Sequence, residues 1–415
     1  MKFTRVFAFM ALAGLAGSAY ATDGYFSHGY GMKAKGMGGA ATASSDDAFF
    51  GANNPAAAAF AGNRLDLGAD LFSPRREASR SGAMMFPNGT SDSESKYFVI
   101  PELGYNHMVN NDLALGVTVY GNGGMNTNYK ALGGAYGNAN LLGGQGKLGV
   151  DLMQLVVAPT AAFKVAPNHS IGVSPLIGYQ RFKAYGLQAF QMTPGMSSDP
   201  ASVTNNGYDD SFGYGVRIGY MGKLTPTFTV GAAYASKMNF DEFSKYKGLF
   251  AEQGGFDIPE NYNLGVAWNV TPTVKLALDY QRINYSGVKS INNPSTNLAQ
   301  LGADNGPGFG WRDVDVWKLG VEYKYSQQWT LRAGYNHTDN PIQARDVTFN
   351  ILAPGVVQDH ATLGFTYTLA SGNELTMAYV HAFKNDVTGT NIFGDGTEKI
   401  QMYQNSLGVQ YSWKM

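Results

Sequence analysis

The chain has 415 residues, a formal net charge of -1 and only 15% charged residues, whereas soluble domains usually carry about 25%. This balance gives no basic surface for nucleic acid, and the absence of cysteine is typical of proteins exported from the cytoplasm. A soluble protein of this length would have two or three domains, yet the composition does not change from about residue 64 to the end, which favours one large domain.

The first 21 residues have the pattern of a secretory signal peptide. Lys2 and Arg5 precede an apolar run over 6–15, and the small-residue ending Ala19-Tyr20-Ala21 predicts cleavage before Thr22. No later segment approaches the roughly 18 uninterrupted apolar residues that a membrane-spanning helix needs. If the exported protein crosses a membrane, it therefore crosses as strands.

Residues 22–63 are rich in Gly and Ala and lack a strand pattern. Two short stretches, about 43–49 and 55–60, are expected to be helical. We predict that 22–63 form a compact plug, and that 64–415 form the domain that contains it.

From residue 64 onward, apolar and polar residues alternate with a period of two. In 261–270, for example, Tyr262, Leu264, Val266 and Trp268 share one face of an extended strand. The pattern recurs fourteen times, at lengths that suit tilted membrane-crossing strands. The expected strands are 64–73, 96–108, 112–121, 150–165, 169–182, 211–223, 227–238, 260–270, 273–285, 312–325, 328–338, 358–369, 373–384 and 403–413. The fold class is therefore predicted to be all-β, a 14-stranded antiparallel transmembrane β-barrel with a plug in its lumen. A barrel this wide cannot be filled by the side chains of its own wall.

The connections alternate between tight turns and long polar loops. Turns such as Asn110-Asn111 and Thr271-Pro272 should face the periplasm, and the long loops should face outward. The long connections are 74–95, 122–149, 184–210, 239–259, 286–311, 339–357 and 385–402.

The side chains that should meet lipid can be read from the alternation. Phe212, Tyr214, Val216 and Ile218 should face lipid, while Arg217 and its glycine neighbours line the lumen. The last strand places Leu407, Val409, Tyr411 and Trp413 on one side, similar to the C-terminal signal read by the barrel-assembly machinery. It ends in Lys414-Met415 instead of an aromatic residue.

Several motifs resemble the FadL/OmpP1/TodX family. They are the stretch 31–41 (G-M-K-A-K-G-M-G-G-A-A), Asp46-Asp47, Asn53-Asn54-Pro55-Ala56, Leu278-Asp279-Tyr280-Gln281, and Leu331 to Tyr335 with the Asn340-Pro341 corner. The resemblance covers essentially the whole mature chain. It implies an outer-membrane channel of a Gram-negative cell for long-chain fatty acids or, in some branches, aromatic hydrocarbons. In that family the plug is called a hatch, and passage is thought to involve a hatch shift and lateral exit through a kinked strand. Gly121, Gly123 and Gly124 could permit such a kink.

Two outer loops carry the candidate residues for substrate capture. Phe243, Tyr246 and Phe250 are spaced to share one face of a short helix. Leu187, Phe190 and the flexible Met192 could add an adaptable lipid-binding surface. The alternative is that these side chains only pack the loops together.

Further candidates lie in the lumen and the hatch. Arg217, Lys318 and Arg332 point inward by alternation, so each could meet a carboxylate, although pairing with neighbouring acids is the alternative. Phe49 and Phe50 are candidate substrate contacts. Asn54, Pro55 and Ala56 are expected to fix the turn from plug to barrel.

Other functional classes have weaker support in the sequence. No G-x-S-x-G or P-loop spacing occurs, and the six histidines are scattered, so no enzyme, cofactor or metal site is predicted. A general porin for hydrophilic solutes and an adhesin-like barrel stay open. The expected partners are a hydrophobic ligand, outer-membrane lipid, lipopolysaccharide and the barrel-assembly machinery, and the protein is expected to be a monomer.

Overall fold

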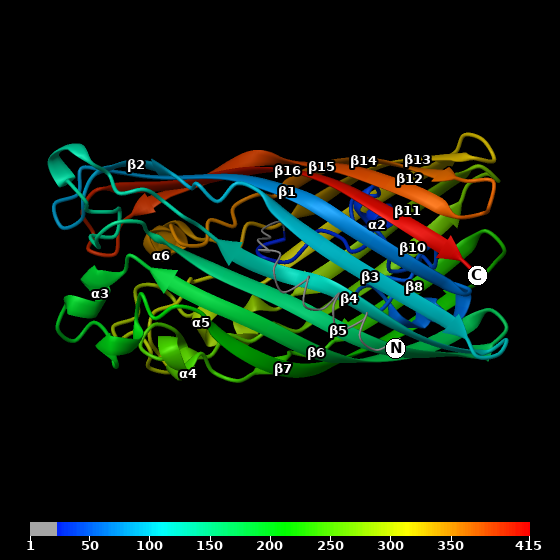
Figure 1. The fold of residues 1–415 in the computed structure, drawn as a ribbon, viewed down its shortest axis with the longest axis horizontal. Coiled ribbons are helices and arrows are strands. Elements are labelled where there is room, and N and C mark those ends of the chain that lie inside the picture. Colours follow the sequence, from blue (N-terminus) through cyan, green and yellow to red (C-terminus); the bar gives the residue numbers. More distant parts are fainter. Residues whose placement is uncertain (1–22) are drawn as a thin grey trace.

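The computed structural model describes residues 23–415, which form one closed antiparallel β-barrel (Figure 1). The predicted signal peptide lies outside the described residues. Every wall strand pairs with its neighbours in chain order, and the first strand pairs with the last, Leu71 opposite Leu407. The fourteen wall strands are β1 (Arg64–Ser81), β3 (Phe98–Met108), β4 (Leu113–Asn126), β5 (Gly149–Ala166), β6 (His169–Tyr185), β7 (Asp209–Lys223), β8 (Phe228–Ala235), β10 (Asn261–Asn269), β11 (Val274–Ile283), β12 (Val314–Lys324), β13 (Trp329–Thr338), β14 (Asp359–Thr368), β15 (Glu374–Thr390) and β16 (Thr397–Lys414). Two short strands, β2 (Gly89–Asp92) and β9 (Asn239–Phe240), extend the sheet beside β1 and β7.

The predicted 14-stranded antiparallel barrel is confirmed, but several strands are longer than expected. β1 runs to Ser81 instead of residue 73, and β16 begins at Thr397 instead of residue 403. Beyond Leu71 the outward side chains of β1 become polar, for instance Arg75 and Glu77, so the hydrophobic alternation stops. Backbone pairing nevertheless continues to the end of the strand.

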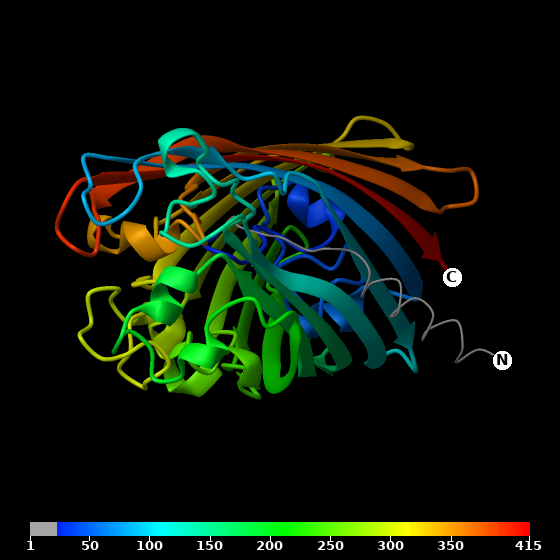
Figure 2. The same ribbon diagram turned by 60° about the vertical axis from the view of Figure 1, so that its left-hand side comes forward.

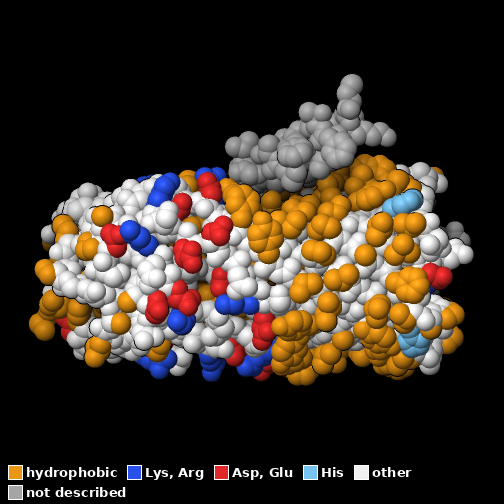
Figure 3. Space-filling model, turned by 90° about the horizontal axis from the view of Figure 1, so that it is seen from below, with side chains coloured by type: hydrophobic (Ala, Val, Ile, Leu, Met, Phe, Trp, Pro, Cys, Tyr) orange, Lys and Arg blue, Asp and Glu red, His pale blue; other side chains and the backbone are white. Residues whose placement is uncertain are grey.

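The outward side chains form an apolar surface on one half of the barrel. Phe212, Tyr214 and Ile218 of β7 are 51%, 65% and 51% exposed, as the alternation predicted. On the face shown in Figure 3, hydrophobic side chains cover the half near the short turns, whereas charged side chains gather on the half toward the long loops. This division matches a barrel embedded in a bilayer over part of its height.

The long connections gather at one end of the barrel, where they carry short helices (Figure 1). These are η2 (Gly134–Tyr136), α3 (Gln188–Met192), η3 (Pro200–Ser202), η4 (Ser244–Tyr246), α4 (Ala251–Gly254), η5 (Tyr285–Gly287), α5 (Lys289–Asn292), η6 (Ala344–Asp346) and α6 (Val347–Asn350).

Within residues 23–415, no helix has the length and apolar character needed to cross a membrane.

Residues 23–63, called here the hatch segment, lie inside the barrel (Figures 1 and 2). The segment contains α2 (Met32–Lys35) and the 3-10 helix η1 (Pro55–Phe60). The expected helix at 55–60 is confirmed, but the one at 43–49 is wrong. There the backbone N–H groups of Ala48 and Phe49 donate to the carboxylates of Asp66 and Asp47, at 2.7 and 3.1 Å, and are not available for helical bonds.

Inward-facing glycines let the hatch segment touch the wall. A Cβ added at Gly334 would lie 2.1 Å from the backbone nitrogen of Gly38, and one at Gly219 would lie 2.1 Å from Oδ1 of Asn54. Close approach of two backbones is one reason for glycine within a strand. The glycines whose added Cβ would come within 3.0 Å of the hatch segment are Gly104, Gly116, Gly123, Gly172, Gly219, Gly231, Gly265, Gly320, Gly334 and Gly408.

We expect Gly334→Val to loosen the hatch segment. The valine would collide with backbone atoms of Met37 and Gly38, and overpacking of this kind costs about 1–3 kcal/mol. Limited proteolysis should cut the hatch segment faster in this variant. The matched control is Ala333→Val, one residue away on the lipid side. Equal rates of cutting in the two variants would contradict close packing of the hatch segment against Gly334.

Candidate functional site

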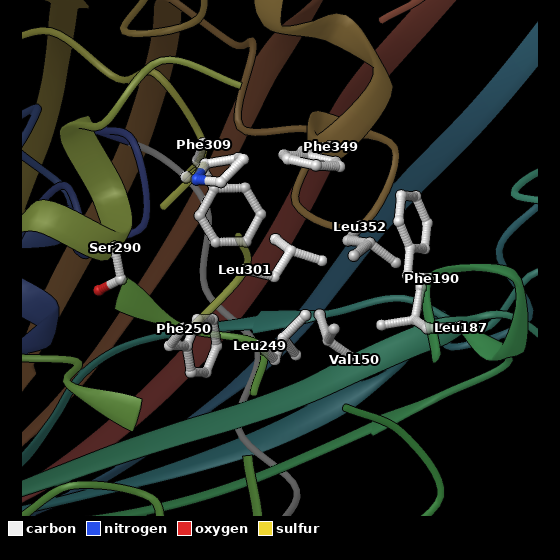
Figure 4. Close-up of a pocket in the computed structure, with 12 residues that line it drawn as sticks. Val150, Leu187, Phe190, Leu249, Phe250, Ser290, Leu301, Phe309, Phe349 and Leu352 are labelled. Carbon is white, nitrogen blue, oxygen red and sulfur yellow. The ribbon is translucent and has the colours of Figure 1, made fainter. Parts of the chain in front are cut away.

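An apolar cavity lies among the outer connections (Figure 4). Its volume is about 40 Å³, so it is a small cavity between closely packed loops. Only Ser290 contributes a polar side chain to the lining. The lining residues are Val150, Leu187, Phe190, Leu249, Phe250, Ser290, Leu301, Pro307, Gly308, Phe309, Phe349 and Leu352. We call this space the loop pocket.

Hydrogen bonds at Asn350 hold one side of the loop pocket. Its Oδ1 accepts from Nε1 of Trp311 at 2.6 Å, and its Nδ2 donates to the carbonyl of Phe309 at 2.7 Å. The side chain is fully buried at the end of α6, so the bonds are shielded from water. Asn350 thereby fixes the segment that carries Phe309 against the segment that carries Phe349.

The sequence-predicted loop residues divide into three groups. Leu187, Phe190 and Phe250 line the loop pocket. Phe243 and Tyr246 are buried behind it and do not line it. Met192 is 70% exposed and lies outside the lining.

The expected short helix through Phe243, Tyr246 and Phe250 is reduced to the three-residue η4. The three rings still converge, because all of them surround Phe182 of β6, with ring-centroid distances of 5.5, 4.9 and 4.7 Å. Packing on the wall, and not helical periodicity, brings them together.

Aromatic rings continue from the loop pocket to the hatch segment. Phe250 lies 5.0 Å from Phe256, which lies 6.2 Å from Tyr25. Tyr25 in turn lies 5.5 Å from Tyr285 and 6.0 Å from Trp311. A row of buried aromatic rings therefore joins the outer loops to the hatch.

The three predicted lumen cations are all buried, but they have different partners. Arg217 donates through Nη1 to the carbonyls of Ala52 and Asn53 in the hatch segment, at 2.5 and 3.2 Å. Arg332 pairs with Glu322 at 2.7 Å.

Lys318 has no ion pair within 4 Å among residues 23–415, although it faces the carboxylates of Asp23 and Asp279. None of the three cations lines the loop pocket.

The predicted hatch residues make internal contacts. Phe49 packs against Gly31 within the hatch segment, and Phe50 packs against Gly116 of β4. Asn54 caps η1: its Oδ1 accepts from the N–H of Ala56 at 3.1 Å. Neither phenylalanine lines the loop pocket, but Phe50 and Arg332 line a polar cavity beside the hatch segment.

Nδ2 of Asn54 donates to the carbonyls of Thr42 and Tyr220, at 2.8 and 2.9 Å. With Pro55 as the first residue of η1, these bonds anchor the helix against β7.

Charged contacts fasten the hatch segment to the wall. Lys35, 1% exposed, pairs with Asp70 of β1 at 3.0 Å and with Glu102 of β3 at 2.7 Å. Lys33 pairs with Glu374 of β15 at 2.6 Å. The hatch is thus held by specific polar contacts in addition to close backbone packing.

The glycine-rich end of β4 is irregular where it meets the hatch segment. The pairing with β5 shifts register between Gly121 and Gly123. At this point Phe26 of the hatch segment forms a bridge with Gly123, and the N–H of Ser27 donates to the carbonyl of Asn122 at 3.3 Å. The irregularity lies where the sequence suggested a kink.

A second cavity, missed by the sequence analysis, has Trp311 and Ala353 in its lining, which closely follow Phe309 and Leu352 of the loop pocket in the chain. It has a volume of about 10 Å³ and is lined by Tyr25, Arg76, Gly124, Met125, Asn126, Trp311, Ala353, Pro354, Gly355 and Met402. Arg76 fell outside the predicted first strand, so its direction was not assigned. Continued alternation from Asp66 and Asp70 would have placed it inward.

A family model described as "Outer membrane protein transport protein (OMPP1/FadL/TodX)" matches residues 14–412. The chain belongs to this family. Members of the FadL/TodX family are outer-membrane channels for hydrophobic compounds.

Solved structures show the same fold. The toluene transporter TodX of P. putida is 19% identical, with a TM-score of 0.69 over 94% of this chain and 99% of that chain. A FadL homologue of Pseudomonas aeruginosa is 16% identical, with a TM-score of 0.71 over 94% and 99%. The Ralstonia pickettii toluene transporter TbuX is 17% identical, with a TM-score of 0.64 over the same shares. No curated protein sequence matches the chain.

Proposed function

We propose that this FadL/TodX family member takes up long-chain fatty acids passively across the outer membrane of a Gram-negative cell, driven by the ligand gradient. The observation that carries the proposal is the loop pocket, with one polar side chain among its lining residues, together with the aromatic rings that continue from it to Tyr25. Apolar side chains of this kind suit contact with a long apolar chain and offer little to a hydrophilic solute.

The physical task is to move an apolar molecule past a polar saccharide layer. Burial of each methylene is worth about 0.8 kcal/mol, so a fatty acid partitions strongly into lipid once it arrives there. Uptake is therefore limited by access of the fatty acid to the membrane, and a series of apolar side chains through the protein would provide that access. The proposal assigns capture to Leu187, Phe190 and Phe250, with Phe243 and Tyr246 supporting them from behind.

The later steps follow from the contacts of the hatch. A shift of the hatch segment would open the path below Tyr25, and exit would occur laterally beside the register shift in β4. The hydrogen bonds of Phe26 and Ser27 at that point make the two steps dependent on each other.

Aromatic hydrocarbons are the second candidate cargo. Two of the similar structures are named toluene transporters, and the rings between the loop pocket and Tyr25 would stack well on a small arene. A hydrophilic porin is disfavoured because the hatch segment occupies the lumen.

Uptake in a deletion strain tests the proposal. Labelled oleate and labelled toluene would be supplied to wild-type cells, to cells lacking this protein, and to cells complemented with the full chain. We expect oleate uptake to fall severalfold on deletion and to return on complementation. Unchanged oleate uptake with reduced toluene uptake would favour the second candidate, and a large steady ion conductance in planar bilayers would favour a porin.

A further inference from the structure

The outside of the barrel wall changes from apolar to cationic along β15, β16 and β1, which lie side by side (Figure 1). Leu71 of β1 pairs with Val99 of β3 and with Leu407 of β16. Leu407 pairs in turn with Tyr379 of β15. All four side chains are exposed and face outward, so this part of the wall meets the hydrocarbon of the bilayer. Arg75 lies further out along β1, about 10 Å beyond Leu71 at about 3.3 Å per residue and a tilt near 40°.

Polar residues lie between these two levels. Ser73, Asn405 and His381 follow one another across β1, β16 and β15. The hydroxyl of Tyr379 donates to Oδ1 of Asn405 at 2.7 Å, and Nδ1 of His381 lies 2.9 Å from the same oxygen. Tyrosine is enriched where the hydrocarbon meets the lipid headgroups. The residues that follow outward, Arg75 among them, therefore lie at the level of the headgroups.

Two cations project from the wall at that level. Arg75 pairs with Tyr403 of β16. The pairing of β16 with β15 shifts register here, and two successive residues of β15, Phe383 and Lys384, are both exposed. Neighbouring strands are about 4.8 Å apart, so Arg75 and Lys384 stand on strands about 10 Å apart, with the exposed ring of Tyr403 on the strand between them.

The charges of these cations are not matched within the described part of the protein. Cζ of Arg75 lies 4.8 Å from the centroid of the Tyr97 ring, and its Nη2 donates to the Tyr97 hydroxyl at 2.8 Å. Neither Arg75 nor Lys384 forms an ion pair within 4 Å among residues 23–415, and the same holds for the exposed Lys96 beside Tyr97. Stacking on Tyr97 thus holds a guanidinium at the surface with N–H donors left for a ligand.

The carboxylates further out on the same strands already have partners. Glu77 accepts from Nε2 of Gln401 at 2.7 Å, and Asp386 pairs with Lys399 at 3.4 Å. They do not neutralise Arg75 or Lys384.

The balance of charge is reversed on β11 and β12. There Asp313 and Asp315 share one cation, Arg282, at 3.1 and 2.9 Å. The excess of cations beside β15, β16 and β1 is therefore a local feature and not a property of the whole circumference.

A phosphorylated sugar headgroup has the chemistry that matches this surface. A guanidinium binds phosphate through paired, charge-assisted hydrogen bonds, and a lysine adds a second positive charge. Exposed aromatic rings can pack against the apolar faces of a sugar. The apolar wall below would contact the acyl chains of the same molecule. The outer leaflet of a Gram-negative outer membrane consists of such a lipid, lipopolysaccharide.

We propose that Arg75 and Lys384, with the rings of Tyr97, Tyr403 and Phe383, bind the phosphorylated sugar headgroup of an outer-leaflet lipid on the outside of the barrel. The sequence analysis expected lipopolysaccharide as a partner but assigned no residues to it. The proposed surface lies outside the lumen and does not depend on the identity of the transported cargo.

The test is a binding measurement on the full mature chain in micelles of a neutral detergent. Native mass spectrometry would give the affinity for lipid A, the acylated and phosphorylated sugar anchor of lipopolysaccharide, and for lipid A from which the phosphates have been removed. EDTA would be present so that divalent cations held by Glu77 or Asp386 do not contribute. We expect the wild type to bind the phosphorylated form about tenfold more tightly. Arg75→Gln combined with Lys384→Gln should reduce this preference to about twofold or less, and each single variant to an intermediate value.

Lys324→Gln is the matched control. Lys324 is an exposed lysine at the end of β12, beside the short turn to β13, so it lies at the opposite end of the barrel. It removes one positive charge, as Arg75→Gln does, but should leave both affinities unchanged. Equal losses in Lys324→Gln and Arg75→Gln would assign binding to net charge and overturn the proposal.

Measurements on the wild type keep the inference testable if the double variant fails to fold. Equal affinity of the wild type for the two forms of lipid A would overturn the proposal. Displacement of phosphorylated lipid A by inorganic phosphate alone would also overturn it, because that result would indicate a site for a free anion and not a surface for a lipid.

Discussion

Replacing Lys35 by leucine is expected to weaken the attachment of the hatch segment to the barrel wall. The substitution would leave the carboxylates of Asp70 and Glu102 buried without their shared cation. Breaking a buried pair by removing one partner typically costs about 3–5 kcal/mol, because an uncompensated charge stays in place. We expect faster proteolysis of residues 23–63 and the appearance of ion conductance in planar bilayers.

The companion variant tests whether charge is the cause. Lys35→Leu combined with Asp70→Asn and Glu102→Gln removes both stranded charges and should restore much of the protection of the hatch segment. Asp70 also accepts from the Ser406 hydroxyl, and Glu102 accepts from the N–H of Gly31 at 3.0 Å, bonds that the amide side chains can still make. If the hatch segment of the triple variant is cut as fast as that of the single variant, its attachment to the wall does not depend on this ion pair.

Placing a charge in the loop pocket should stop capture of apolar cargo. Leu249 lines the pocket and is only partly buried, so Leu249→Asp can fold with its carboxylate hydrated. Occupation of the pocket by an alkyl chain would then require that carboxylate to lose water, which costs several kcal/mol. We expect oleate uptake at limiting concentration to fall by about tenfold or more.

Two controls accompany the Leu249 variant. Leu249→Met keeps the volume and apolar character and should transport normally. Leu298→Asp places the same charge on the fully exposed side chain of a neighbouring loop, and it should also transport normally. A similar loss in Leu249→Asp and Leu298→Asp would assign the effect to surface charge and not to the pocket.

The barrel could be predicted from sequence because lipid imposes a simple rule on the outward face. Phe212, Tyr214 and Ile218 had to be apolar, so their spacing revealed the strand. This requirement for apolar side chains applies only to the part of a strand that contacts lipid. The outer part of β1, from Pro74 onward, lacks the apolar pattern and was therefore assigned to a loop. Side chains that face the interior of the barrel do not contact lipid, so no comparable apolar pattern is imposed on them.

The hatch and the site were harder to predict because contacts distant in sequence decide them. The bond from Ala48 to Asp66 replaces the helix expected near 43–49, and the pairing of Lys35 with the wall accompanies a helix that was not expected at Met32–Lys35. In the loop pocket, Leu187 and Phe190 were identified from the apolar composition of their loop, and Phe250 was identified from its spacing to Phe243 and Tyr246. Phe309, Phe349 and Leu352 join them only through the folding of separate loops.

The unequal lengths of the strands determine the height of the rim. At about 3.3 Å per residue and a tilt near 40°, the 18 residues of β16 rise about 45 Å, whereas the apolar band of such barrels is about 25 Å tall. The 8 residues of β8 rise only about 20 Å. The rim of the barrel is therefore uneven: it stands about 20 Å above the hydrocarbon along β15, β16 and β1 and again along β5 and β6, and it is lowest at β8. If the proposed function holds, an apolar molecule diffusing among the surface sugars would meet the protein at that height before it reaches the membrane.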